Sequence, residues 1–295
     1  MIPAGFDYLR PATITEALEM ASCHDGARFL AGGHAILPDW KLGHGRPSTL
    51  IDLGRIPELR GIEMQGPAVR IGAMTTSAEI EYSPAIARTA PLLPQAAAVI
   101  SDPLIRNRAT LGGSLAEASP SGDWPPVVLA ADATIHLRSH AGERAVPASD
   151  FFSQNGAGSG TGSTALRRGE LLTAVTVPAA GARARCTYLK RMHPATGHAM
   201  IGVAVAAAFN TDETCRDCRI AITGTATVAT RAARAESRLT GSRLTRETIQ
   251  AAADAANDGI AFTGDPFGSA TYLAELLPIY VNRALTQITT PPART

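Results

Sequence analysis

Two pairs of consecutive glycines constrain the fold of this 295-residue chain more than any other feature of its sequence. Gly32-Gly33 follows an expected strand at 27–31, and Gly112-Gly113 follows the basic stretch 106–108. Consecutive glycines allow backbone conformations closed to residues with a Cβ, so several amide N–H groups can converge on one anion. Either turn alone is more often an ordinary tight turn. Two such turns in separate lobes of one chain predict a clamp that holds a diphosphate from both sides.

The first 57 residues have the pattern of a small α/β lobe. Thr13-Ile14-Thr15-Glu16 predicts a capping box, in which Thr13 accepts from the third amide of a helix and Glu16 reaches back. Short strands are expected at 27–31 and 49–53. A strand that runs directly into Gly32-Gly33 places the first turn at the end of a sheet.

The pattern changes after residue 57. A hairpin around Gln65-Gly66-Pro67 is expected first, followed by several short helices and two more strands. The expected hairpin strands are 61–64 and 69–72, the helices 77–81, 84–89 and 91–100, and the later strands 133–138 and 171–177. These elements predict a second lobe over residues 58–178.

The last third of the chain, residues 179–289, has the pattern of a separate α+β unit. Strands are expected at 186–192, 201–209 and 216–225, and helices at 230–239, 245–257 and 270–287. Strands grouped before helices predict helices packed on one face of an antiparallel sheet. The tail at 289–295, which contains Pro291-Pro292, is expected to fray.

Composition excludes several functional classes. A net charge of +1 gives no basis for a nucleic-acid-binding field, and no uncharged apolar run is long enough to span a membrane. The first residues lack a basic start and an apolar stretch, and four cysteines do not suggest a disulfide framework; both favour a cytoplasmic location with reduced thiols. Charged residues make up 18% of the chain, against a usual value of about 25%, which suits a subunit partly covered by partners.

Motifs for hydrolysis, metal binding and nucleotide loops are missing or incomplete. The stretch 156–162 is glycine-rich but does not satisfy G-x-G-x-x-G, so a flexible surface loop is expected. Cys215-x-x-Cys218 is a lone pair without a second pair of ligands, which favours a structural role over zinc. His193 and His198 lie in a loop with proline and glycine, where a surface or gating role is more plausible than metal binding. No metal site and no catalytic residue is expected in this chain.

Eight short stretches carry a resemblance to a known family. They are 31–38, 50–53, 71–76, 102–107, 110–115, 119–123, 169–172 and 188–191. In order and spacing they resemble the FAD-binding (medium) subunits of molybdenum hydroxylases, the family of the carbon monoxide dehydrogenase medium subunit and the xanthine dehydrogenase flavin domain. The resemblance implies an α+β fold: a bipartite FAD-binding domain of the vanillyl-alcohol-oxidase (PCMH) type at 1–57 and 58–178, then an α+β C-terminal domain at 179–289.

The resemblance also implies roles for individual residues. The first turn would cradle the FAD pyrophosphate, the second would meet it from the other lobe, Asp123 would accept hydrogen bonds from ribityl or ribose hydroxyls, and Lys190 would lie near the isoalloxazine. Leu171 and Leu172 would pack on the rings, and Ile100 and Ile105 either line the cofactor channel or belong to the core. The full set is Ala31, Gly32, Gly33, His34, Ala35, Ile36, Leu37, Ile100, Ile105, Thr110, Gly112, Gly113, Ser114, Glu117, Asp123, Leu171, Leu172 and Lys190.

Four features depart from or vary within the family pattern, and one is His34, which is another polar residue in some relatives. Ser114 stands where some relatives have Asn or Asp, Glu117 stands where others carry a small or hydroxylated residue, and the loop 192–199 differs. Because that loop would lie near the flavin edge, the terminal electron acceptor stays open between a quinone, oxygen, a cytochrome and NAD.

The implied function is that of an electron-transfer subunit. Electrons would pass from 2Fe–2S clusters on a small subunit to FAD in this chain, while the molybdenum cofactor and the substrate belong to a large subunit, often in a dimer of heterotrimers. The four cysteines do not supply the ligand pattern of an iron–sulfur cluster. Two alternatives stay open: a stand-alone FAD-dependent oxidoreductase of the same fold, and an interaction module that has lost its cofactor.

Overall fold

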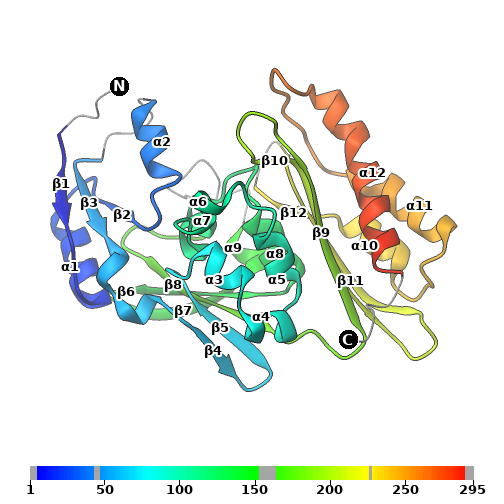
Figure 1. The fold of residues 1–295 in the computed structure, drawn as a ribbon, viewed down its shortest axis with the longest axis horizontal. Helices are drawn as coiled ribbons and strands as arrows, with labels where there is room; N and C mark the ends of the chain where they lie inside the picture. The colour runs from blue at the N-terminus through cyan, green and yellow to red at the C-terminus, as the bar shows by residue number, and fades with distance from the viewer. Residues whose placement is uncertain (1–4, 43–46, 153–163, 226–227, 290–295) are drawn as a thin grey trace.

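The computed structural model describes residues 5–42, 47–152, 164–225 and 228–289. Three sheets follow one another along the chain and across the molecule (Figure 1). We call them the N-terminal, central and C-terminal sheets. The expected glycine-rich loop at 156–162 and the tail beyond Thr289 lie outside the described residues.

The N-terminal sheet is parallel and small. Its strands are β1 (Asp7–Leu9), β2 (Arg28–Leu30) and β3 (Thr49–Asp52), in the order β1-β3-β2. Helix α1 (Ile14–Cys23) connects β1 to β2, and α2 (Ile36–Lys41) follows the first glycine pair. Thr13 caps α1 as expected, accepting from Glu16 N at 3.1 Å. Glu16, however, accepts from the N–H of Ala12 rather than that of Thr13, so the reciprocal half of the capping box is shifted by one residue.

The central sheet has five antiparallel strands in the order β4-β5-β8-β6-β7. They are β4 (Ile62–Gln65), β5 (Ala68–Gly72), β6 (Thr134–Ser139), β7 (Gly142–Pro147) and β8 (Leu171–Pro178). The hairpin expected around Gly66 is confirmed, whereas β7 was not foreseen. Two turns of 3-10 helix, Leu53–Arg55 and Pro57–Leu59, lead from the N-terminal sheet into this one.

Short helices fill the space between the central and C-terminal sheets (Figure 1). They are α3 (Ser77–Glu81), α4 (Pro84–Thr89), α5 (Leu92–Ala97), α6 (Pro103–Arg106), α7 (Leu111–Glu117) and α8 (Trp124–Ala130), with α9 (Ala148–Phe151) after β7. The third expected helix, 91–100, is shorter at both ends. The sequence did not predict α6 to α9 as separate helices.

The C-terminal sheet is antiparallel in the order β12-β11-β10-β9. Its strands are β9 (Ala184–Met192), β10 (Ala199–Phe209), β11 (Cys215–Thr223) and the two-residue β12 (Thr230–Arg231). Helices α10 (Ala233–Leu239), α11 (Arg246–Asp254) and α12 (Ala270–Gln287) lie on one face. The helix expected at 230–239 is therefore wrong at its start, because residues 230 and 231 pair with β11. The helix expected at 245–257 ends at residue 254 as α11, and a 3-10 turn follows at Ala255–Asn257.

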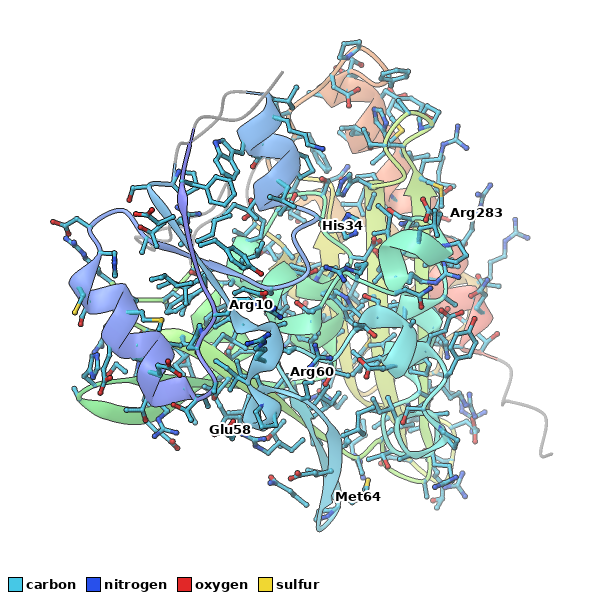
Figure 2. All side chains as sticks on the ribbon, turned by 60° about the vertical axis from the view of Figure 1, so that its left-hand side comes forward. Arg10, His34, Glu58, Arg60, Met64 and Arg283 are labelled. Atoms are coloured by element: carbon cyan, nitrogen blue, oxygen red, sulfur yellow. The ribbon has the colours of Figure 1, made fainter. Side chains whose placement is uncertain are left out.

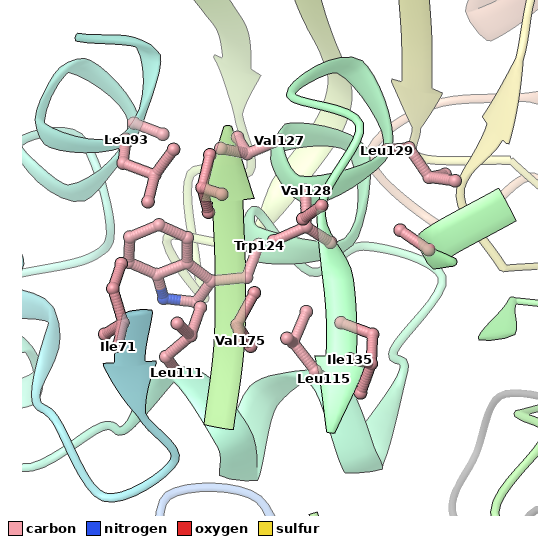
Figure 3. Packing of buried hydrophobic residues seen from close by; sticks show 14 of the residues in the cluster. Ile71, Leu93, Leu111, Leu115, Trp124, Val127, Val128, Leu129, Ile135 and Val175 are labelled. Atoms are coloured by element: carbon pink, nitrogen blue, oxygen red, sulfur yellow. The ribbon is translucent and has the colours of Figure 1, made fainter. Parts of the chain in front are cut away.

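One hydrophobic core joins the central sheet, its helices and the inner face of the C-terminal sheet. The Trp124 indole packs among Ile71, Leu111 and Val175, and its Nε1 donates to Ser77 Oγ at 3.2 Å (Figure 3). The same cluster contains Tyr188, Ala204 and Ala221 of the C-terminal sheet. Helix α8 contacts β10 and β11 of the C-terminal sheet, and its first residue, Trp124, packs on the central sheet. Asp123, which directly precedes α8, therefore lies at the seam between the two sheets.

Candidate cofactor site

The two glycine turns, 80 residues apart in sequence, are in contact. A Cβ built on Gly32 would overlap the carbonyl oxygen of Arg108 and lie 3.0 Å from the Cα of Ala109. On the other side, a Cβ on Gly113 would lie 3.4 Å from the Cβ of Ala31. The absence of a side chain at Gly32 therefore allows the two stretches of backbone to approach each other, as the sequence predicted, and Gly113 lies within van der Waals reach of Ala31.

The first turn carries amide donors without acceptors. The backbone N–H groups of Gly33, His34 and Ala35 have no acceptor among the described residues. Gly33 adopts a left-handed conformation with φ +82°, which a residue with a Cβ rarely takes. His34 is exposed and lies on the stretch between β2 and α2, where the N-terminal sheet faces the rest of the chain (Figure 2). Three neighbouring donors in one turn can together bind an anion.

The second turn, Gly112-Gly113, is not a separate tight turn but the first turn of α7, capped by Thr110, and it has a different role. Its backbone N–H groups already have acceptors within the protein. Leu111 N donates to Thr75 O at 3.0 Å, Gly112 N donates to Ala73 O at 2.8 Å, and Gly113 N donates to Thr110 Oγ1 at 3.2 Å. A Cβ on Gly112 would lie 2.5 Å from that of Ala73. This turn contributes a close-fitting wall, and the donors come from the first turn alone.

Asp123 forms the centre of a second group of residues, at the start of α8. Its carboxylate accepts from the Tyr188 hydroxyl at 2.6 Å and from Lys190 Nζ at 3.1 Å. The side chains of Lys190 and Asp123 are only 3% and 6% exposed. Lys190 Nζ also donates to the carbonyl of Gly197 at 3.0 Å. The buried ammonium is thereby held by one charged and one neutral acceptor.

Strand geometry explains how Tyr188 and Lys190 reach the same carboxylate. Residues two apart on a strand point to the same face, so both side chains of β9 point toward α8. The neighbouring strand leaves room for the phenol at Gly202, where a Cβ would lie 2.5 Å from the Tyr188 hydroxyl. A glycine in the middle of β10 is therefore part of the site.

Burial and charge shift the acidities of these groups. Burial raises the pKa of Asp123, and the Lys190 ammonium and the Tyr188 hydrogen bond oppose that rise. Burial and the neighbouring carboxylate raise the pKa of Tyr188, so the phenol keeps its proton and acts as a donor. Burial also lowers the pKa of His198, with Asp123 opposing and Lys190 and His193 reinforcing.

The remaining expected residues divide between core and surface. Leu171 and Leu172 are buried but face opposite sides of β8: Leu171 packs with the N-terminal cluster around Ile51, and Leu172 with the central core. The expected apolar pair therefore does not present a common face. Ile100 is 8% exposed in the central core. The others, Ile36, Ile105, Ser114 and Glu117, are partly buried, and Leu37 is exposed.

Sequence reasoning missed three contributors to the second group: Tyr188, Gly197 and Gly202. The spacing of Tyr188 and Lys190 in an expected strand was a usable signal for the first. Neither glycine had such a signal in the sequence. Gly202 matters only because it lies beside Tyr188 on the neighbouring strand, and Gly197 only because its loop brings its carbonyl to Lys190. The second turn begins α7 and Asp123 precedes α8, and these two helices pack together. The packing of α7 on α8 therefore connects the turns to the Asp123 group.

The chain is similar to proteins of known function along nearly its whole length. Residues 4–180 match the family described as the FAD binding domain in molybdopterin dehydrogenase, and residues 187–288 match the CO dehydrogenase flavoprotein C-terminal domain. The chain belongs to the FAD-binding subunits of molybdenum hydroxylases. This flavin subunit is 38% identical to the carbon monoxide dehydrogenase medium chain of Hydrogenophaga pseudoflava over 286 residues, 97% of each chain. It is 34% identical to the nicotine 6-hydroxylase medium subunit of Paenarthrobacter nicotinovorans, over 95% of this chain and 96% of that one.

Solved structures agree with this assignment. The carbon monoxide dehydrogenase from Hydrogenophaga pseudoflava that lacks the Mo-pyranopterin moiety contains a chain with a TM-score of 0.91 and 39% identity, covering 98% of both chains. Quinoline 2-oxidoreductase from Pseudomonas putida 86 matches with a TM-score of 0.88 and 29% identity, over 98% of both chains. The expected α+β fold, the FAD cofactor and the oxidoreductase class are confirmed for this flavin subunit.

Other features of the flavin subunit bear on metals and membranes. Across the described residues, no group of three or more His, Cys, Asp or Glu is placed to hold a metal ion. Cys215 and Cys218 are buried in the C-terminal core. None of the helices in the described part of the chain is long and apolar enough to cross a membrane.

Proposed function

We propose that the flavin subunit binds the diphosphate of FAD with the first turn and supports the rest of the cofactor from the second turn and the Asp123 group. The amides of Gly33, His34 and Ala35 donate to the diphosphate. Gly112 and Gly113 form the wall opposite, and the Ser114 hydroxyl supplies a polar atom there. This proposal depends on one observation, the three neighbouring amides without acceptors in a turn that touches a second glycine turn.

Each residue of the Asp123 group has a defined part. When bound, FAD accepts electrons singly and releases them in pairs, which connects one-electron donors to a two-electron acceptor. Tyr188 and Lys190 use only part of the acceptor capacity of the Asp123 carboxylate. The remaining lone pairs accept from a hydroxyl of the cofactor. The Lys190 ammonium, fixed by two acceptors, favours negative charge on a nearby ring system and so raises its reduction potential.

We further propose that the subunit works in a larger assembly, with a large subunit that carries the molybdenum cofactor and a small subunit that carries 2Fe–2S clusters. The relatives support this, because they are named as a medium chain, a medium subunit and a subunit of a dehydrogenase complex. A dimer of such heterotrimers is the arrangement we expect. Recovery of two further chains with the tagged subunit from its native host, in equal amounts, would support it; recovery of the flavin-loaded subunit alone would favour a stand-alone oxidoreductase.

A pair of matched variants tests the diphosphate site. Gly33 and Gly66 both have left-handed φ angles, +82° and +59°, but Gly66 lies at the tip of the β4–β5 hairpin. A valine at either position costs about 1–2 kcal/mol of stability, because it forces a branched side chain into that conformation. Only Gly33→Val should also weaken FAD binding, by about 30-fold or more, since that equals the loss of two hydrogen bonds.

The measurement is a fluorescence titration of purified chain with FAD, together with the absorption spectrum of the protein as isolated. Equal FAD affinity in Gly33→Val and Gly66→Val would contradict the diphosphate site. A wild-type chain that neither carries nor binds flavin would contradict the proposed function as a whole.

A further inference from the structure

The loop between β9 and β10, residues 193–198, is closed by hydrogen bonds of its own backbone. His193 N donates to the carbonyl of His198 at 2.8 Å, and Gly197 N donates to that of His193 at 3.0 Å. His198 N donates to Thr196 Oγ1 at 3.3 Å. The loop is therefore a compact turn with a fixed shape, and the Gly197 carbonyl at its end accepts from Lys190.

The imidazole of His193 supplies the remaining acceptor of this turn. Its Nδ1 accepts from the backbone N–H groups of Ala195 and Thr196, each at 3.2 Å. An atom that accepts two amide hydrogens cannot itself carry a proton. The hydrogen-bond pattern thus requires the neutral tautomer that is protonated on Nε2.

The other edge of the same ring is held by the segment that precedes α12. His193 Nε2 lies 3.3 Å from Asp265 Oδ2, and the Phe267 ring packs edge-on against the imidazole with a centroid distance of 4.5 Å. The second oxygen of Asp265 accepts from the N–H groups of Phe267 and Gly268, at 2.8 and 2.9 Å. Asp265 therefore shapes its own turn with one oxygen and holds His193 with the other. The tip of the β9–β10 hairpin and the start of α12 lie at the same end of the C-terminal sheet (Figure 1).

A continuous series of contacts thus joins the surface of the C-terminal unit to the buried ammonium. It runs from Asp265 to His193, through the amides of Ala195 and Thr196 to the Gly197 carbonyl, and from there to Lys190. Gly197 permits the last step, because its φ is +74° and a Cβ there would lie 3.2 Å from Ser101 Oγ. The ring of His193 is only 12% exposed, so it has little freedom to move.

We propose that His193 is a positioning residue for Lys190. Its Nδ1 fixes the turn that presents the Gly197 carbonyl to the ammonium, and Asp265 and Phe267 fix the ring. Through Lys190 this arrangement sets the charge environment of the flavin, a step that rests on the proposed function. The proposal assigns a task to the loop that the family resemblance left open.

Three substitutions of His193 distinguish the contribution of its Nδ1 edge from that of the edge that contacts Asp265. His193→Asn keeps an acceptor oxygen near the position of Nδ1, because asparagine side chains accept from amides two and three residues ahead. His193→Gln reaches toward Asp265 but offers no acceptor to those amides. His193→Phe keeps a ring against Phe267 and removes both nitrogens. His140→Phe, at an exposed position in the β6–β7 turn, is the matched control.

The lysine content of the chain makes a direct readout possible. The sequence contains two lysines, Lys41 and Lys190, and Lys41 is exposed. Reductive methylation followed by mass spectrometry therefore reports the accessibility of Lys190 against an internal reference. Residue-resolved amide hydrogen exchange at Ala195 and Thr196 reports the turn itself. Both measurements use the full chain without added FAD.

In His193→Phe and His193→Gln we expect amide exchange at these two positions to accelerate by about tenfold or more, because each amide loses its acceptor. Methylation of Lys190 should also become faster relative to Lys41. His193→Asn should stay within about threefold of wild type in both measurements, because the acceptor is restored. The proposal is overturned if His193→Phe has the same amide exchange and Lys190 methylation rates as His140→Phe. It is also overturned if these rates are as high in His193→Asn as in His193→Phe.

A third measurement addresses the flavin. In the FAD-loaded chain, His193→Phe should lower the midpoint potential, and His193→Asn should restore it. An unchanged potential in His193→Phe, with Lys190 released, overturns the link to the cofactor. If the wild-type chain binds no FAD, the proposed function fails, and exchange and methylation still decide whether His193 positions Lys190.

Discussion

The buried pair of Asp123 and Lys190 allows a quantitative test of whether these residues support the fold before any cofactor is bound. Their side chains are 6% and 3% exposed, and their charged atoms lie 3.1 Å apart. Removing one member of such a pair leaves an uncompensated charge in the interior, which costs about 3–5 kcal/mol. Lys190 retains the Gly197 carbonyl and Asp123 retains the Tyr188 hydroxyl, so we expect the lower end of that range, about 3 kcal/mol, for either single change.

The variants are Asp123→Asn, Lys190→Met and the double variant. Asparagine keeps an oxygen for the Tyr188 hydroxyl, and methionine has nearly the length of lysine without its charge. The double variant buries no charge, and buried ion pairs can be replaced by uncharged groups at little cost. Its loss of stability should therefore be smaller than that of either single variant, which corresponds to a coupling free energy of at least about 3 kcal/mol.

The assay is urea unfolding of the FAD-free chain, followed by circular dichroism, with all four proteins at one pH. The exposed pair Arg168 and Asp25, whose side chains are 89% and 96% exposed, serves as a control and should show no measurable coupling. Additive effects of Asp123→Asn and Lys190→Met, with a coupling below about 0.5 kcal/mol, would refute the claim that each charge depends on the other.

Further predictions concern the second turn, an ion pair and the thiols. Gly113→Val should raise the Kd for FAD by about 30-fold or more, because its Cβ would lie 2.8 Å from the Thr110 hydroxyl that caps α7 and its methyl groups would extend toward Ala31 of the first turn; an unchanged titration would contradict this. Glu170→Gln should lose about 2 kcal/mol at neutral pH, since Arg144 holds that carboxylate through bonds of 2.7 and 2.8 Å. Arg144 lowers the pKa of Glu170, so this stabilisation is present above the unfolded value of about 4.3 and disappears as the pH falls through the folded pKa. Urea midpoints of the two proteins should therefore converge in acid; a constant difference down to the lowest pH would contradict the assignment. Of the four thiols, exposed Cys23 should react with a disulfide reagent first, whereas partial burial raises the pKa of Cys186 to about 11; labelling of Cys186 as fast as that of Cys23 would contradict this.

Most of what the sequence did not predict lies in short elements that show no clear hydrophobic period. Strand β1 has three residues and pairs with β3, which lies more than 40 residues away, so nothing local marks it. Strand β7 lies at an edge of the central sheet and alternates poorly, with charged residues at 143 and 144. Helix α8 begins Trp-Pro-Pro and is buried on all sides, so it shows no amphipathic period. The long hydrophobic strands and the late helices were predictable because their periodicity is strong.

The glycine turns show where sequence reasoning about a site ends. That the turns meet could be predicted, because paired glycines at two places imply close backbone approach. Which turn keeps its amides for a ligand could not, since Gly112 donates to Ala73, a residue 39 positions earlier. The opposite orientation of Leu171 and Leu172, in contrast, follows from strand alternation and could have been predicted from their positions alone.

The position of the Asp123 group at the seam between two sheets explains why these charges are tolerated. Tyr188 and Lys190 come from β9 and Asp123 from the start of α8, and each side of the seam alone would leave its polar groups in water. Docking the C-terminal sheet on α8 removes all three from solvent in one step, and the cost is offset only if ammonium, carboxylate and phenol meet with good geometry. A shift of β9 by one residue would turn Lys190 away from Asp123 and place either Leu189 or the bulkier Arg191 there. The pair thus specifies one register of the seam, and the same register brings the Gly197 carbonyl and the His193 turn to the ammonium.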